Sequence, residues 1–279
     1  MYYITAEINS LNEYIDFIHN YQMNNKTKLW YRGQKNNFWT LDSTIDRNKE
    51  LNVPPLGQIA ELKYKNIPNF MHEIIALEKM IGSNMPKKYN RFHLMFLGQH
   101  YGLKTPALDW STDPLVALYF ALSGFVRDGE AYPVVFILKP SMLNENSKIQ
   151  IGDKALHTPL NVDFLPNTIF NRWFSDINKT PFDTVPLAVL SNYNLSYRIS
   201  RQSGVFTLMD ARQPLNYPWI QTKINDETFG IAIKINPNKV TDIRKHLVSL
   251  NITRSTIYGA RPNRLDNICT NINKNTPVI

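Results

Sequence analysis

The sequence of 279 residues predicts an α+β fold. Segments with a helical spacing of apolar residues alternate irregularly with short runs that are rich in β-branched and aromatic residues. No internal repeat or low-complexity segment is evident, and no shift in composition marks a linker. An irregular order of helices and strands is typical of this class. We therefore expect one domain over residues 1–279, with a core at 28–272 and an N-terminal helix and lead-in at 1–27.

The first elements follow from local signals. Ser10 and Glu13 have capping-box spacing before apolar residues at helical period, which predicts a helix that ends in the polar run 20–26. A short strand is expected at 28–32 and ends in Arg32, with Gly33 after it. Arg32 either projects into a cleft or lies in solvent on an edge strand. Residues 55–82 have helical spacing interrupted at Pro68, which predicts two helices or one kinked helix.

The stretch from 92 to 121 is the most distinctive part of the chain. A helical pattern runs into Gly102, which suits a left-handed helix C-terminus. A short polar turn is expected at 105–112, and a second helix then begins with Asp113 as N-cap and Pro114 at its first position. The turn and the two residues before Tyr101 carry many hydrogen-bonding side chains. These groups either cap the backbone of a helix–helix junction or bind a ligand.

The second half of the chain is less regular. Strands are expected at 131–138 and 229–235, and helices at 240–250 and 265–272. Gln202 precedes Gly204, which opens an alternating strand, so its amide is expected at a strand entrance. One cluster mixes aromatic side chains with a cation, either as a base-stacking surface or as packing beneath a long loop: Phe164, Phe170, Arg172, Trp173 and Phe174.

Composition limits the class of protein. The formal net charge is +8, with 31 Lys and Arg against 23 Asp and Glu, which favours polyanionic partners. The single cysteine, Cys269, excludes an intramolecular disulfide and a cysteine-rich metal site. The longest apolar run, 114–126, is too short to span a bilayer, and no secretory leader opens the chain. We expect a cytoplasmic protein without a membrane partner.

The common catalytic motifs are absent. The six histidines have no HExxH or paired ligand spacing, and no P-loop, GxGxxG turn or GxSxG elbow occurs. Three separated positions remain: Arg32, Ser111–Thr112 and Gln202. An arginine can hold a pyrophosphate, hydroxyls before a helix can order a ribose, and an amide can hold a ribose 2′-hydroxyl while a nicotinamide bond breaks. Alignment and electrostatics can do much of the catalysis in such an oxocarbenium-like transition state.

Four segments of the sequence resemble the FRG-domain family. Residues 31–34, Tyr-Arg-Gly-Gln, are similar to the F/Y-R-G signature, and residues 38–43 with Arg47 to the second block of the family. Residues 99–121 resemble the block Q-H-x-G-L-x-T-x-x-L-D-W-T/S, and residues 201–206 the later element Q-x-G-x-F. The resemblance covers residues 29–269, and its central block is long and specific.

The FRG arrangement is in turn similar to ADP-ribosyltransferases, so the resemblance implies a mixed β core with several flanking helices, and NAD as substrate. It implies catalytic roles for Arg32 and Gln202. Many active transferases have glutamate where this chain has Gln202, and a glutamine cannot act as a base. His100 and Asp109 are therefore the candidates for a general base. The residues implied to bind NAD are Tyr31, Arg32, Gly33, Gln34, Thr105, Trp110, Ser111 and Thr112.

FRG-domain proteins occur in bacterial defence, and a related activity is the ADP-ribosylation of messenger RNA by an antiphage toxin of a toxin–antitoxin–chaperone system. The resemblance thus implies a transferase toxin that modifies nucleic acid, with RNA as the expected acceptor and an antitoxin protein as partner. The basic charge and the 170–174 aromatic cluster agree with such an acceptor. Two alternatives stay open: a non-catalytic module that senses a nucleotide or a phage protein, and an NAD glycohydrolase.

Overall fold

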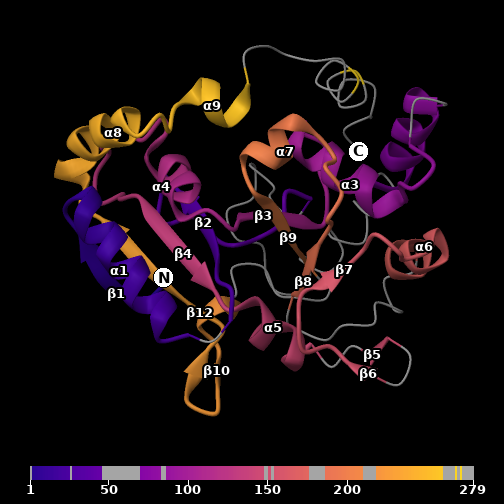
Figure 1. The fold of residues 1–279 in the computed structure, drawn as a ribbon, viewed down its shortest axis with the longest axis horizontal. Helices are drawn as coiled ribbons and strands as arrows, with labels where there is room; N and C mark the ends of the chain where they lie inside the picture. Colours follow the sequence, from indigo (N-terminus) through magenta and orange to yellow (C-terminus); the bar gives the residue numbers. More distant parts are fainter. Residues whose placement is uncertain are drawn as a thin grey trace.

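The computed structural model describes residues 2–25, 27–45, 70–82, 86–147, 150–151, 154–175, 186–209 and 218–259, together with residues 268 and 271. These residues form an α+β structure in which helices pack on a large mixed sheet (Figure 1). The α+β class expected from the sequence is confirmed. In the described ranges, no helix is long and apolar enough to cross a bilayer.

The large sheet has eight strands in the described part of the chain. Their order across the sheet is β1 (Ile4–Ile8), β12 (Gly230–Ile235), β4 (Val134–Leu138), β2 (Trp30–Gln34), β3 (Ala107–Ser111), β9 (Gly204–Leu208), β8 (Leu187–Leu190) and β7 (Leu160–Asn161). The outermost pairs, β1–β12 and β7–β8, are parallel, and the inner pairs are antiparallel. Two small hairpins are separate from it: β10 (Lys223–Ile224) with β11 (Glu227–Thr228), and β5 (Gln150–Ile151) with β6 (Lys154–Ala155).

The two middle strands of the sheet, β2 and β3, share the fewest paired residues. Strand β2 pairs with β4 along all five of its residues, and β3 pairs with β9 in the same way. Between β2 and β3, however, the register contains one residue pair, Tyr31 with Ser111. The sheet is therefore two four-stranded halves that touch at one point and then separate, which leaves room for a cleft.

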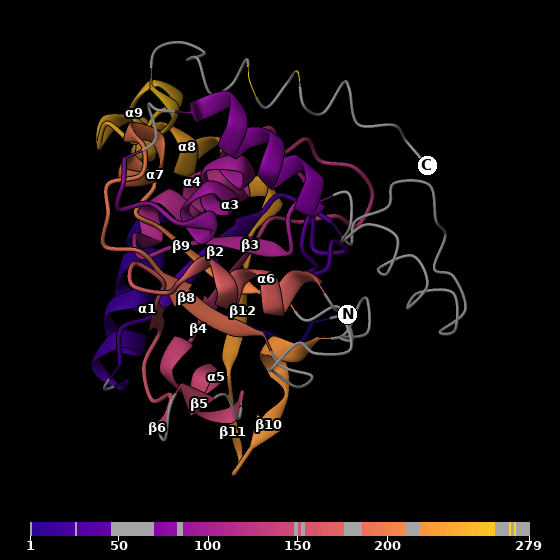
Figure 2. The same cartoon turned by 90° about the vertical axis from the view of Figure 1, so that its right-hand side faces the viewer.

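Helices cover one face of both halves. On the first half lie α1 (Leu11–Met23), α4 (Pro114–Leu122) and α8 (Val240–Ser249), and on the second lie α3 (Arg91–His100), α6 (Asn167–Ser175) and α7 (Tyr197–Arg201) (Figure 1). The short elements α9 (Arg254–Tyr258) and η4 (Pro237–Lys239) flank α7 and α8. Figure 2 shows α3, α4, α7 and α8 on one side of the molecule, with α5 (Pro140–Asn146) and the β10–β11 hairpin on the other. The opposite face of the sheet packs around Trp30, Phe136 and Trp219, the last from η3 (Trp219–Gln221).

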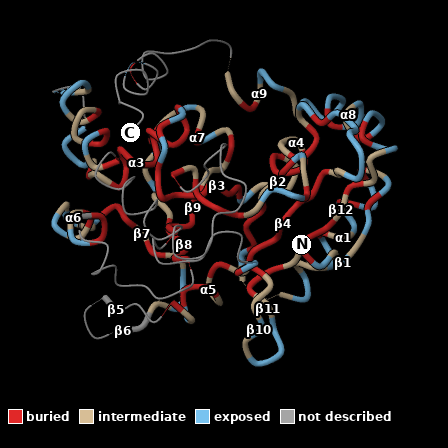
Figure 3. The backbone as a smooth tube through the Cα atoms, turned by 180° about the vertical axis from the view of Figure 1, so that it is seen from behind, coloured by how far each residue is buried: buried red, intermediate tan, exposed pale blue. Residues whose placement is uncertain are grey.

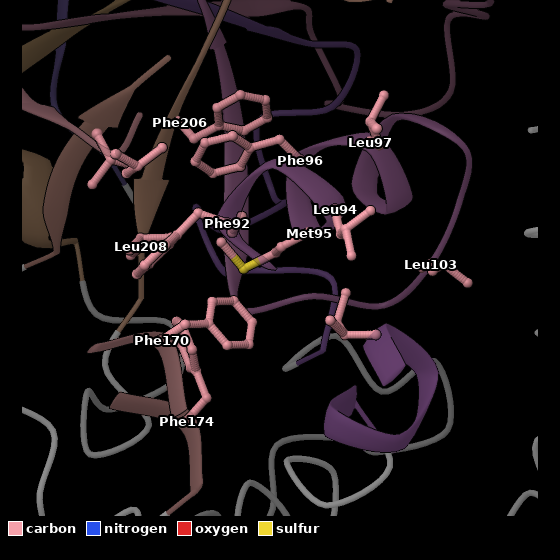
Figure 4. Packing of buried hydrophobic residues seen from close by; sticks show 14 of the residues in the cluster. Phe92, Leu94, Met95, Phe96, Leu97, Leu103, Phe170, Phe174, Phe206 and Leu208 are labelled. Atoms are coloured by element: carbon pink, nitrogen blue, oxygen red, sulfur yellow. The ribbon is translucent and has the colours of Figure 1, made fainter. Parts of the chain in front are cut away.

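Burial follows this layering. The central strands are buried along most of their length, whereas the outer sides of α6 and α8 and the β10–β11 turn are exposed (Figure 3). Figure 4 shows the core beneath α3, where Phe92 packs against Phe170 and Phe174 of α6, and Phe96 stacks on Phe206 of β9 with the ring centroids 4.0 Å apart. This core fixes α3, and with it the position of His100 at the end of that helix.

The local signals of the sequence predicted several elements correctly. Ser10 caps α1 by accepting a hydrogen bond from Glu13 N, and Asp113 caps α4 with Pro114 at its first position. Gly102 adopts a positive φ of 92° after α3. The expected strands at 131–138 and 229–235 are β4 and β12, the helix at 240–250 is α8, and the strand at 28–32 is shifted to Trp30–Gln34.

One expectation was wrong. Residues 107–111 are not a polar turn but β3, a central strand, because the polar side chains at alternate positions find partners on distant segments. Of the two alternatives for the aromatic cluster, packing is confirmed, because Phe170, Trp173 and Phe174 are buried against α3, whereas Phe164 is exposed by itself. Residues 70–81 are helical as expected. Arg47, residues 55–69 and most of the helix expected at 265–272 lie outside the described residues.

Candidate functional site

A cleft of about 360 Å³ lies where β2 and β3 separate. Its walls come from β2 and the turn after it, the end of α3, β3, α4, α7 and α9. The volume is in the range of small-molecule sites, about 300–1,000 Å³. Most of the residues expected to form a site line this cleft, namely Tyr31, Arg32, Gly33, Gln34, His100, Asp109, Trp110, Ser111 and Gln202. Thr105 and Thr112 are not among the lining residues.

Arg32 lines the cleft and links the two strands that separate there. Its Nη1 donates a hydrogen bond to the main-chain oxygen of Asp109, 2.5 Å away, across the gap between the two strands. The neighbouring residue, Gly33, allows α4 to pack directly on β2, since a Cβ at this position would lie 1.9 Å from the main-chain oxygen of Ala117. Gln34 is buried and donates from Nε2 to the oxygen of Thr40 at 3.3 Å, which fixes the turn after β2.

Asp109 is held by a second contact through its side chain. Its Oδ2 accepts a hydrogen bond from Gln99 Nε2 at 3.2 Å. The Oε1 of Gln99 accepts from the hydroxyls of Thr44 and Thr105, which orients the amide. Thr105 is fully buried, so its position beneath the cleft supports Asp109 through Gln99 and does not reach a ligand.

His100 and Asp109 face each other across the cleft wall. His100 Nε2 lies 3.9 Å from Asp109 Oδ1, just beyond hydrogen-bond distance, and both atoms are buried without a hydrogen bond of normal geometry to the described residues. Burial lowers the pKa of His100, with a further lowering by Arg198, while Asp109 and Gln202 raise it in part. His100 is therefore neutral near pH 7 and able to accept a proton. A Cβ at Gly204 would lie 3.3 Å from His100 Nε2, so the glycine leaves room beside the ring.

Gln202 lies opposite β2, at the C-cap of α7. Its Nε2 donates to the oxygen of Ile257 in α9 at 3.4 Å, and its main-chain oxygen accepts from Ser111 Oγ at 2.7 Å. Ser111 Oγ also accepts from Asp113 N at 2.9 Å, so this hydroxyl joins β3, α4 and α7. Thr112 has an exposed side chain and donates from its main-chain N to the oxygen of Ser203. Of the two hydroxyl residues expected at the site, Ser111 is the one at the cleft.

Trp110 contributes less to the cleft than its position in the sequence indicates. Its indole Nε1 donates to Thr207 Oγ1 at 3.0 Å, and its ring packs against Trp219 on the opposite face of the sheet. Tyr31 packs in the core beneath α4, and burial raises its pKa to about 12. The Tyr31 hydroxyl is therefore neutral at physiological pH.

The cleft also contains side chains that were not predicted as site residues, among them Lys35, Trp39, Arg198 and Tyr258. The guanidinium of Arg198 lies 4.7 Å from the ring centroid of Tyr258 and 5.6 Å from that of Tyr101. Arg198 is four residues before Gln202, the spacing that places two residues on one side of a helix, and this was a signal that could have found it. Tyr258 has no comparable signal because α9 is far from the other segments in sequence.

The charges around the cleft favour an anion. The lining of the cleft includes three basic side chains, those of Arg32, Lys35 and Arg198, and one carboxylate, that of Asp109. Arginine donates in a fork that matches phosphate oxygens, and an aromatic wall suits a planar ring beside the charges. No group of three or more His, Cys, Asp or Glu side chains suitable for a metal ion occurs in the part of the chain that the structure describes. The cleft is therefore suited to a phosphorylated ligand with a planar ring.

The sequence of this region is similar to a known family. Residues 27–128 match the family model of the FRG domain, which supports the FRG resemblance over that range. The matched segment contains β2, α3, β3 and α4, and thus Arg32, His100, Asp109 and Ser111. Gln202 and Arg198 lie outside it. No curated protein and no solved structure matches the chain.

Proposed function

We propose that the protein is an NAD-dependent ADP-ribosyltransferase that transfers ADP-ribose to nucleic acid, with RNA as the acceptor. The observation that carries the proposal is the meeting of Arg32, Ser111 and Gln202, from three separate segments, around one cationic cleft that also contains His100 and Asp109. The similarity of residues 27–128 to the FRG domain supports the same reading.

Arg32 and Arg198 bind the pyrophosphate of NAD in this proposal. A guanidinium has five N–H donors, and the bond from Arg32 to the Asp109 oxygen uses one of them. Gln202 uses its Nε2 to bind Ile257, which leaves Oε1 as the acceptor for the ribose 2′-hydroxyl. Ser111 fixes the main chain at Gln202 by donating to its main-chain oxygen.

The reaction breaks the bond between ribose C1′ and the nicotinamide nitrogen, and the electron pair of that bond goes to the nicotinamide ring. A nucleophilic atom of the acceptor bonds to C1′, and its proton passes to neutral His100. Asp109 Oδ1, 3.9 Å from His100 Nε2, stabilises the imidazolium that results. The cleft groups align the ribose while positive charge develops on it, which requires no covalent nucleophile.

The biological setting belongs to the same proposal. The net charge of +8 favours a polyanionic acceptor. A transferase that modifies cellular RNA would be toxic to its own host, so we infer a cytoplasmic toxin of antiphage defence that an antitoxin protein neutralises. This part of the proposal rests on the FRG similarity and on the charge.

The test is incubation of the purified protein with NAD labelled in the adenylate part and with separate pools of RNA, DNA and protein. We expect the label on RNA. Label on protein alone would contradict a nucleic-acid acceptor, and release of free ADP-ribose alone would favour the glycohydrolase. NAD binding without turnover would indicate a sensing module. Arg32→Ala should abolish the transfer, whereas Arg172→Ala, which removes an exposed arginine of α6, should leave it unchanged.

A further inference from the structure

The turn after β2 exposes two large aromatic side chains. Phe38 is 53% exposed and Trp39 is 46% exposed. We call residues 35–40 the rim turn, because Lys35 and Trp39 line the cleft and Phe38 lies beside them outside its lining. Adjacent exposed aromatic residues at a cleft indicate an interaction site more strongly than a single one does.

The rim turn is held in place by several hydrogen bonds. Asn37 N donates to the oxygen of Tyr132 at 3.1 Å, and Tyr132 N donates to Asn37 Oδ1 at 3.0 Å. At the end of the turn, the oxygen of Thr40 accepts from Gln34. Because both ends and the middle of the turn are tied to the fold, the two rings are presented to solvent in a preorganised arrangement.

A cation accompanies the two rings. Lys35 Nζ lies 5.5 Å from the centroid of the Trp39 ring. Exposed aromatic rings beside a basic groove are the means by which proteins bind single-stranded nucleic acid without sequence preference, since every base has a face to stack. The adjoining cleft adds Arg32 and Arg198 to the positive charge.

We propose that the rim turn binds the single-stranded nucleic-acid acceptor, with bases stacked on Trp39 and Phe38 and a phosphate near Lys35. This inference rests on the proposed function for the identity of its ligand as the acceptor. Trp39 lines the cleft, so a small ligand bound in the cleft can contact it, whereas Phe38 lies outside the lining. A ligand that stacks on both rings therefore extends out of the cleft, as a polymer does. The rim turn thus replaces the buried 170–174 cluster as the surface that receives bases.

The experiment measures binding without NAD, by fluorescence anisotropy of a labelled ten-nucleotide single-stranded RNA of mixed sequence. The variants are Phe38→Ala, Trp39→Ala, the double variant and Trp39→Phe. We expect a loss of affinity of about tenfold for each alanine variant and more for the double variant, with most affinity kept in Trp39→Phe. Phe164→Ala is the matched control, because it removes a ring that is 83% exposed and not part of the cleft.

Several outcomes would overturn the proposal. The first is that the wild-type protein binds neither single-stranded RNA nor single-stranded DNA. The second is that it binds a duplex of the same sequence as tightly as the single strand. The third is that the alanine variants bind RNA as tightly as Phe164→Ala does. NAD affinity is measured in parallel. A fall in NAD affinity as large as the fall for RNA would assign the rim turn to the adenine of NAD instead. Loss of RNA binding in the alanine variants of a protein that never cleaves NAD would refute the proposed function and leave the rim turn as a nucleic-acid site.

Discussion

Arg32 Nη1 donates to the main-chain oxygen of Asp109 across the gap where β2 and β3 separate. A side chain here makes a contact that backbone pairing makes elsewhere in the sheet. The residue proposed to bind phosphate therefore also helps to set the width of the cleft, so its substitution has two measurable effects.

Arg32→Ala should lower both activity and stability. The loss of a guanidinium from the phosphate site should reduce kcat/KM for NAD by about 100-fold or more. The unpaired Asp109 oxygen should lower the free energy of unfolding by about 1–3 kcal/mol without unfolding the chain. Single-turnover NAD cleavage and urea denaturation measure the two effects, and full activity in the folded variant would remove Arg32 from the site.

Substitutions of Gln202 test whether the cleft catalyses a reaction or only binds a ligand. Gln202→Ala should lose about 100-fold in turnover and much less in NAD affinity, because the contact to the ribose strengthens as charge develops. Gln202→Glu should keep measurable turnover through its carboxylate oxygen, although it loses the bond to Ile257. Wild-type turnover in Gln202→Ala would eliminate this role, and a binding module would change affinity alone.

Substitutions of Ser111 and its neighbour Thr112 test whether the Ser111 hydroxyl stabilises the junction of β3, α4 and α7. Ser111→Ala removes hydrogen bonds to Gln202 and Asp113 and should lower the free energy of unfolding by about 1–3 kcal/mol. Thr112→Ala alters an exposed side chain and should change it by less than about 0.5 kcal/mol. Chemical denaturation measures both, and equal effects would contradict the role given to Ser111.

Gly33 should tolerate no side chain. A Cβ there would overlap the backbone of α4, so Gly33→Ala should cost about 3 kcal/mol or more, or prevent folding. Gly129→Ala is the control, because nothing lies within 4 Å and the cost is limited to its positive φ, about 1–2 kcal/mol. Thermal melts of both variants test the difference, and similar melting temperatures would mean that α4 can move away from β2.

Stability should fall as the pH is lowered below about 6.5, the ordinary pKa of histidine. Burial lowers the pKa of His93 and His100 in the folded state, so the unfolded chain binds protons first as the pH falls. His93 Nδ1 accepts from Asn90 N, so its Nε2 donates to Asp163 in the neutral form. Urea denaturation between pH 5 and 8 should give a curve that is flat above pH 7, with a smaller slope below it for His93→Gln. An unchanged slope in that variant would show that His93 does not contribute to the pH dependence of stability.

The sequence predicted the elements that local chemistry determines. Asp113–Pro114 marks a helix start wherever it occurs before apolar residues, and β4 is apolar at every position. Strand β3 was not predictable in this way, because Asp109 and Ser111 are satisfied by Gln99 and Gln202, which only the tertiary structure brings near.

The candidate site was predictable to the extent that it lies in characteristic motifs. Tyr31–Gln34 and the block from Gln99 are continuous in sequence, and the structure brings both to one cleft. Arg198 lies in a short helix, and its only signal is that it precedes Gln202 by four residues. The 170–174 aromatic residues were ambiguous because an apolar face looks the same whether it packs on a neighbour or on a base.

The cleft is complete only when the chain has been made as far as α9. Its walls begin at Tyr31 and end at Tyr258, and β12, which closes the first half of the sheet between β1 and β4, is made after residue 229. Because chains emerge from the ribosome N-terminus first, a nascent chain carries Arg32, His100 and Asp109 long before it carries the opposite wall. Translation that stops before α9 would therefore release a protein without a complete site, so any activity of this cleft begins only after α9 has been made.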